Sequence, residues 1–260
     1  MPVTWTPVAD RVFVATVDPH RVNVGLVVGD DGALLVDTGN TAEQGAELRA
    51  AAEQHAGVPV THVVLTHDHH DHVGGLDGVR AAGDPVTVIG HENVTSVELD
   101  RALVVAVSLN LGNQRVEIIN FGDAHTNSDV VLFVPTTSTV FAGDLLEEGA
   151  DPQVDETTSL GNWPTYLDGI LGATSAATRF VPGHGAVVDR DFAFIQRAEL
   201  SMIYSQAEML VQQGVQLEDA AAAAEWPFSA DTIAAALPLA YKELAAKGIT
   251  PKRQLPIFGI

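Results

Sequence analysis

The order strand, helix, strand over residues 33–66 is the feature that most constrains how this chain folds. The apolar runs "ALLVDTG" (33–39) and "PVTHVVLT" (59–66) flank a segment rich in Ala and Glu, residues 41–57, which opens on Thr41, a residue type that caps helices. Two strands joined through a helix pair in parallel within one sheet. This order therefore predicts a layered α/β fold.

Further short apolar runs bounded by turn residues predict additional strands, at residues 11–16, 23–29, 85–90, 114–121, 129–135, 138–144 and 179–184. A helix is predicted at residues 163–174, whereas residues 91–111 fit either a helix or a strand. From about residue 190 the sequence changes to Ala, Gln, Glu and Leu at helical spacing. Because no linker is visible, we expect one domain over residues 1–190 and a helical C-terminal extension over residues 191–260 packed on it.

Composition excludes several classes of function. The chain has 260 residues, of which 46% are hydrophobic, enough to bury a core. A formal charge of −21 with 13 Lys and Arg argues against a nucleic-acid partner. No apolar run approaches the roughly 18 residues of a membrane span, and no secretory signal is visible at the N-terminus, so we expect a cytoplasmic protein that acts on a small molecule. The oligomeric state stays open.

The chain contains no cysteine, so any metal ion must be held by His, Asp or Glu side chains. The stretch "VVLTHDHHDHVGG" (63–75) concentrates such residues directly after a buried strand, at the end where open α/β sheets place their sites. In an extended turn, His67 and His69 point the same way and can grip one ion. Asp71 and His72 then point toward a second ion. The two remaining polar residues of the stretch, Asp68 and His70, are expected to face away.

A single His is more often structural than a metal ligand. The metal site is therefore favoured only because further His and Asp residues occur at other strand ends. His125 lies in "GDAHTNSD" before one predicted strand, and Asp144 lies in "VFAGDLL" after another. His184 lies in "RFVPGHGAV", between glycines that free the backbone to turn. Together with the first cluster they provide five His and two Asp, enough for two metal ions.

The motifs "THDHHDHVGG", "AHT", "AGD" and "PGHG", preceded by "LLVDTG", resemble those of the metallo-β-lactamase-fold hydrolases, in the family's order and over residues 12 to about 188. The resemblance implies an αββα sandwich. It also implies that one metal ion is held by His67, His69 and His125. The second would be held by Asp71, His72 and His184, with Asp144 bridging both ions. Asp37, in "VDTG", would brace the ligand loop by hydrogen bonding, although a turn-capping role is nearly as consistent.

Ligands of this kind suit two zinc ions, and iron or manganese as well. Two such ions would share a water molecule and lower its pKa so that hydroxide attacks a carbonyl carbon. Asp71 would orient the hydroxide and move a proton to the leaving group, and Thr66 and Thr126 would support the ligands. This predicts cleavage of an ester, thioester, lactone or lactam.

Positions 72 and 144 narrow the branch of the family. His at position 72 and Asp at position 144 disfavour the β-lactamases that carry Arg and Cys there, and the chain resembles the glyoxalase II, lactonase and esterase-like branches instead. Two alternatives from other classes remain open. One is an oxidoreductase similar to the persulfide dioxygenases, which use the same motif with one iron. The other is a metal-bound scaffold without catalysis.

Substrate contacts are the least constrained by the sequence. Trp163, Tyr166 and Phe141, together with the loop 145–165, are expected to line the pocket, because a long irregular loop after a site strand is often functional. The sequence of that loop is also consistent with an acidic surface loop that has no part in the site. Lys252 and Arg253 near the C-terminus are the candidates for holding glutathione, although a basic pair is more often solvated.

Overall fold

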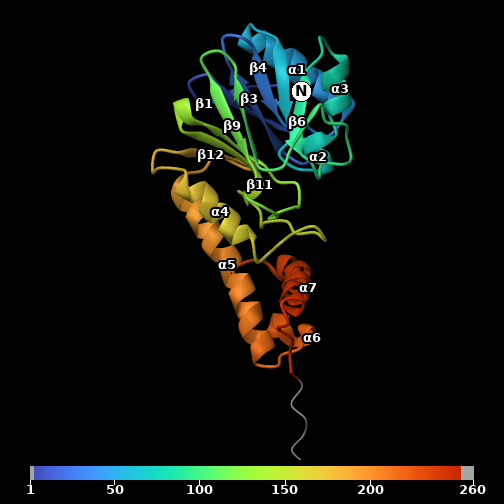
Figure 1. The fold of residues 1–260 in the computed structure, drawn as a ribbon, viewed down its shortest axis with the longest axis vertical. Coiled ribbons are helices and arrows are strands. Elements are labelled where there is room, and N and C mark those ends of the chain that lie inside the picture. Colours follow the sequence, from blue (N-terminus) through green and yellow to red (C-terminus); the bar gives the residue numbers. More distant parts are fainter. Residues whose placement is uncertain (1–2, 253–260) are drawn as a thin grey trace, which may run out of the picture.

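The computed structural model describes residues 3–252 of the chain, and Figure 1 shows how its elements are arranged. The predicted strand, helix, strand order is present as β4 (Ala33–Val36), α1 (Ala42–Ala56) and β5 (Val60–Val64), and β4 pairs with β5 in parallel. Thr41 caps α1, because its side chain accepts a hydrogen bond from the Gln44 backbone N–H. The layered mixed sheet with helices is therefore confirmed.

The sheet consists of two halves. The first contains seven of the described strands, which are β1 (Thr6–Ala9), β2 (Val12–Val17), β3 (Val22–Val28), β4, β5, β6 (Thr87–His91) and β7 (Arg101–Leu103). The second contains β8 (Ala106–Asn110), β9 (Arg115–Ile119), β10 (Val131–Val134), β11 (Thr139–Glu147) and β12 (Arg179–His184). Only one residue pair, Val22 with His184, connects β3 of the first half to β12 of the second.

Alternation of side chains along the strands shows that the two halves pack face to face. In β4, Leu34 and Val36 belong to a core that contains residues of both halves, whereas Ala33 and Leu35 join α1 in a separate core. Since successive side chains point to opposite faces of a strand, each half-sheet buries one face against the other half and one against helices. The arrangement is an αββα sandwich, as predicted.

Helices cover the two outer faces of the sandwich. On the first half lie α1 and the short helices α2 (His70–Val73) and α3 (Leu76–Ala81). The second half is covered by α4 (Trp163–Gly172) and the start of α5 (Arg190–Gln212), whose Ala193 and Leu200 pack in the same core as Trp163. Two 3₁₀ turns complete the described elements, Pro135–Thr137 and Ala221–Ala223.

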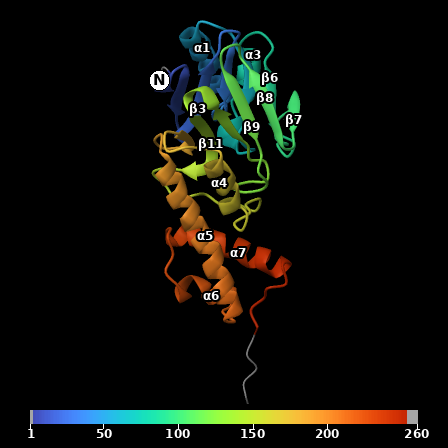
Figure 2. The same ribbon diagram turned by 60° about the vertical axis from the view of Figure 1, so that its left-hand side comes forward.

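A helical C-terminal region extends beyond the sandwich, as expected from the sequence, and it is visible in both ribbon views (Figures 1 and 2). It consists of the later part of α5 with α6 (Leu217–Ala220) and α7 (Ala230–Ala246), which share a core of their own. The Glu243 carboxylate of α7 accepts hydrogen bonds from the backbone N–H groups of Leu160 and Gly161, in the loop before α4. The division at residue 190 remains a prediction, because α5 takes part in both cores.

Three local features of the strands go beyond the sequence-based expectation. Residues 91–111, which fitted a helix or a strand, contain β7 and β8, and the short strand β1 was not predicted. Strand β11 runs on to Glu147 rather than ending at residue 144. Among the described helices, none combines the length and apolar character needed to cross a bilayer.

Candidate metal centre

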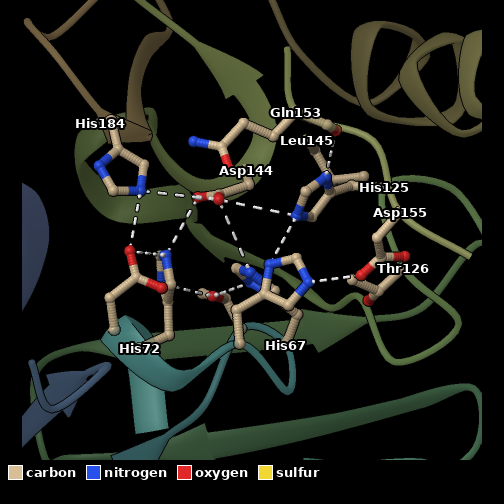
Figure 3. Close-up of polar contacts among 12 residues, drawn as sticks. His67, His72, His125, Thr126, Asp144, Leu145, Gln153, Asp155 and His184 are labelled. Carbon is tan, nitrogen blue, oxygen red and sulfur yellow. Dashed lines mark hydrogen bonds and ion pairs between the residues drawn. The ribbon is translucent and has the colours of Figure 1, made fainter. Parts of the chain in front are cut away.

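Four separate segments, from both halves of the sandwich, carry the predicted site residues to one place (Figure 3). His67 and His69 follow β5, and Asp71 and His72 lie on α2. His125 lies between β9 and β10. Asp144 is within β11, and His184 is the last residue of β12. All seven predicted residues are brought together.

The seven side chains form two groups joined by Asp144. Potential ligand atoms of His67, His69, His125 and Asp144 lie within 4.8 Å of one another, and so do those of Asp71, His72 and His184. Asp144 Oδ1 lies 3.1 Å from His72 Nε2, and Asp144 Oδ2 lies 3.6 Å from both His125 Nε2 and His184 Nε2. The carboxylate of Asp144 therefore faces ring nitrogens of both groups, the position that a bridging ligand requires.

Each of the five histidines has its outer ring nitrogen held by another group of the protein. Their partners, with distances, are Thr66 Oγ1 for His67 Nδ1 (3.0 Å), Asp155 Oδ2 for His69 Nε2 (2.9 Å), Asp37 Oδ2 for His72 Nδ1 (2.8 Å), the Gln153 carbonyl for His125 Nδ1 (3.1 Å) and the His20 carbonyl for His184 Nδ1 (2.9 Å). An outer contact of this kind fixes the tautomer and orientation of a metal-binding imidazole. Four of the inner nitrogens lie 3.1–3.7 Å from Asp144 oxygens, and His69 Nδ1 lies 3.1 Å from His125 Nε2, so the residues present fit a metal centre.

Two glycines allow Asp144 to reach this position. Gly143 has a left-handed φ of 53° and lies where the pairing of β11 with β12 becomes irregular. A Cβ atom on Gly183 would lie 1.7 Å from Asp144 Oδ1, closer than any side chain allows. Both positions therefore require a residue without a side chain.

Electrostatics of the cluster favour positive charge at its centre. Burial lowers the pKa of His125 to about 4 and that of His67 well below its ordinary value. Burial also opposes the charged form of His184, but hydrogen bonds to Asp144 and Asp71 raise its pKa to about 10. Although burial disfavours its ionised form, the neighbouring His72 and His67 hold the pKa of Asp144 well below the usual range. The Asp144 carboxylate is therefore ionised and attracts cations.

The residues that were predicted to support the ligand loop, or to face away from the centre, have different contacts in the structure. Asp37 does contact the ligand loop, since it accepts hydrogen bonds from the backbone N–H of Thr66 at 2.7 Å and from the Thr66 hydroxyl at 2.8 Å. The Thr126 hydroxyl donates to Asp129 Oδ1 at 2.8 Å, and burial raises the pKa of Asp129 to about 7. Asp68 faces away, because its carboxylate accepts the backbone N–H of Thr95 at 2.8 Å.

A cavity of about 930 Å³ opens beside the two groups and is lined in part by His69, Asp71, His184 and residues 147–150 and 153–155 of the loop 145–165. His70, which was expected to face away, also lines this cavity, although it belongs to neither of the two groups of His and Asp side chains. The prediction that this loop contributes to the pocket is confirmed for its first half only.

The aromatic pocket prediction is wrong. Trp163, Tyr166 and Phe141 are all buried in the hydrophobic cores, and the Trp163 indole N–H donates to the Leu145 carbonyl at 3.1 Å. Burying large aromatic side chains stabilises the core, which explains why these three pack there rather than line the cavity. Lys252 does not line the cavity, and Arg253 lies outside the described residues.

Sequence reasoning missed two acidic residues beside the centre, Asp155 and Glu147. Asp155 contacts His69 across 86 residues of sequence, and Glu147 is buried with its pKa raised by burial to about 7. Both lie in the acidic stretch "EEGADPQVDE", where the only available signal was their residue type.

Comparison with known proteins identifies the family. The family model described as the metallo-beta-lactamase superfamily matches residues 17–184. A metallo-beta-lactamase type 2 of Bacillus cereus is 26% identical over 178 residues, covering 64% of this chain and 68% of that protein. A hydroxyacylglutathione hydrolase of Cereibacter sphaeroides is 27% identical over 163 residues, 62% of each chain. Among solved structures, a metallo-beta-lactamase from Pontibacter korlensis has a TM-score of 0.68 with 25% identity, covering 76% of this chain and 99% of that one. With its αββα sandwich and its clustered His and Asp residues, this chain belongs to the metallo-beta-lactamase superfamily.

Proposed function

We propose that the chain is a hydrolase that holds two divalent metal ions and cleaves a carbonyl ester, thioester, lactone or lactam of a small molecule. The observation that carries the proposal is the outward anchoring of all five histidines, which leaves four inner nitrogens 3.1–3.7 Å from Asp144 and that of His69 beside His125. Relatives named as a metallo-beta-lactamase and as a hydroxyacylglutathione hydrolase support hydrolysis at the level of the family.

The proposed ligands follow the two groups of the structure. His67, His69 and His125 would hold one ion, and Asp71, His72 and His184 the other, with Asp144 shared. This set of imidazole and carboxylate donors suits zinc, and it also accommodates iron and manganese. When bound, a pair of such ions polarises the substrate carbonyl and makes water a nucleophile near neutral pH.

The chain's own residues would position the reaction. Asp71 lines the cavity with Oδ2 lying 3.3 Å from His184 Nε2, and we assign it the task of orienting the attacking water and carrying its proton to the leaving group. Asp37 and Thr66 would hold the ligand loop, since Thr66 contacts both Asp37 and His67. The cavity beside Asp71 would admit the substrate.

Metal analysis combined with a substrate screen tests this function. Wild type and the variants Asp144→Ala and Asp71→Asn are analysed for bound metal and assayed with thioesters, lactones and β-lactams. We expect two ions per wild-type chain, loss of metal in Asp144→Ala, and at least about a hundredfold loss of kcat in Asp71→Asn, the lower range for a lost proton-transfer group.

Asp68→Asn is the matched control, because Asp68 lies in the same motif with its carboxylate bonded to Thr95 and Ser96. It should keep both ions and the activity. Hydrolysis that persists after complete metal removal would contradict the proposal. A chain with one iron that consumes oxygen with a persulfide would support the oxidoreductase alternative instead.

A further inference from the structure

Glu147 is a buried acidic residue that the proposed reaction leaves without a task. It ends β11, three residues after Asp144, and its Cα is paired with that of His184 in β12. The residue is 4% exposed, yet it lines the cavity beside the metal centre. It is therefore almost enclosed by protein while facing the site.

The strand irregularity explains how Glu147 reaches the same place as Asp144. Residues three apart on a regular strand point to opposite faces. Here the register of β11 against β12 shifts twice, first between Phe141 and Gly143 and again between Gly143 and Glu147. As a result, carboxylate oxygens of Asp144 and Glu147 and a ring nitrogen of His184 lie within 4.8 Å of one another.

Glu147 differs from the other acidic residues of the cavity in having no partner. Asp155 contacts His69, and Glu148 accepts the backbone N–H of Ala186 at 2.7 Å. Glu147 Oε2 is buried without a hydrogen-bond partner, and no Lys or Arg of residues 3–252 forms an ion pair with this carboxylate. A buried carboxylate without a partner is unfavourable when ionised, so Glu147 either keeps a proton or is paired with a cation, and a cation in the site would stabilise its ionised form.

The same property marks the atoms that face the metal centre. His67 Nε2, His72 Nε2 and Asp144 Oδ1 are likewise buried without a hydrogen-bond partner. Given the metal centre proposed above, on which this inference rests, we propose that Glu147 is an additional ligand of the ion held by Asp71, His72 and His184. The added carboxylate oxygen makes this position richer in hard donors, which raises its affinity for Mn²⁺ and Fe²⁺ relative to the same position without Glu147.

Calorimetric titration of the metal-free full-length chain with Mn²⁺ and, separately, Zn²⁺ tests the assignment. The variants are Glu147→Gln, which keeps the shape of the side chain, and Glu147→Ala, which removes the donor atoms. Glu148→Gln is the control, since its carboxylate lines the same cavity but is already hydrogen-bonded. We expect the second equivalent to bind at least about tenfold more weakly in both Glu147 variants, with a larger change for Mn²⁺ than for Zn²⁺. The first equivalent should bind as in wild type.

The outcomes separate this inference from the proposed function. Wild type that binds fewer than two ions would remove the basis of both. If wild type binds two ions and both Glu147 variants match it within about twofold, only the ligand role of Glu147 is overturned. The role is also overturned if the variants keep both ions but lose hydrolysis of ammonium-bearing esters alone, because Glu147 would then contact substrate. Circular dichroism of the metal-free variants shows whether they fold. If Glu147→Ala does not fold, the metal titration of Glu147→Gln alone tests the ligand role of Glu147.

Discussion

His72 Nδ1 lies 2.8 Å from Asp37 Oδ2, although 35 residues separate the two in sequence. Asp37 holds a left-handed φ of 66°, which directs its carboxylate at both His72 and the backbone N–H of Thr66. With the Asp37 oxygen as acceptor, His72 donates through Nδ1 and turns Nε2 toward Asp144. This contact ties the strand β4 to the orientation of a proposed metal ligand.

Asp37→Asn should weaken metal binding. Asparagine tolerates the left-handed conformation, but its amide NH₂ group would face an N–H or O–H donor now bonded to the carboxylate. We expect about 10- to 100-fold lower affinity for one Zn²⁺ equivalent, the range for lost partners of metal-binding histidines. Titration of the metal-free protein measures this, with the exposed Asp31→Asn as control. Equal affinity in the two variants would show that Asp37 only shapes its turn.

Asp155→Asn should weaken the other metal position. Asp155 Oδ2 lies 2.9 Å from His69 Nε2, and the pKa of Asp155 is held below its usual range first of all by this hydrogen bond. Losing the charged partner leaves His69 less well oriented, so we expect about tenfold weaker binding of one equivalent.

The control for Asp155 is Thr157→Val, which removes the hydrogen bond from the Thr157 hydroxyl to Asp155 Oδ1 but leaves Oδ2 in place. Metal titration and limited proteolysis of the loop are compared in the two variants. A similar loss of affinity in both would indicate that order in the loop, rather than the contact with His69, determines binding.

Gly183→Ala should disrupt the centre. The new Cβ would lie 1.7 Å from Asp144 Oδ1, so the carboxylate must move away from His72. We expect loss of at least one metal ion and a free energy of unfolding lower by about 1–3 kcal/mol, typical of an overpacked interior. Gly172→Ala, at the end of α4, is the control, because its Cβ meets nothing within 4 Å. Metal content and urea unfolding of both variants test the prediction.

Asp129 should make stability depend on pH. Burial raises its pKa to about 7 in the folded chain, against about 3.9 when unfolded. Between pH 4 and pH 7 the folded state keeps a proton that the unfolded state releases, so the free energy of unfolding falls as pH rises through this window.

Asp129→Asn removes that dependence. The free energy of unfolding of the variant minus that of wild type should therefore increase from pH 4 to pH 7, by up to about 1.4 kcal/mol per pH unit. Urea unfolding of the metal-free proteins at several pH values measures the difference, which also cancels the titration of the histidines common to both. A difference that does not change with pH would show that the two hydrogen bonds from Thr126 keep Asp129 ionised.

The sequence by itself determined the layered fold and the residues that meet at the centre. Strand ends can be recognised from the local sequence, because apolar runs stop where turn residues begin. His67, Asp144 and His184 all lie at or near such ends. Parallel pairing aligns the ends of β4 with β5 and of β11 with β12, and the packing of the two halves brings these ends together, so local pattern and topology together predicted the cluster.

Only the tertiary structure decided which of the remaining residues belong to the site. Asp155 reaches His69 because an irregular loop folds back over the centre, and Glu147 joins Asp144 because the β11 register shifts. Neither the path of this loop nor the register shift produces a periodic pattern in the local sequence from which it could be predicted. Trp163 shows the opposite case, a residue next to the site in sequence that packing drew into the core. Long-range packing sets these positions, and the local pattern of a single sequence contains no information about that packing.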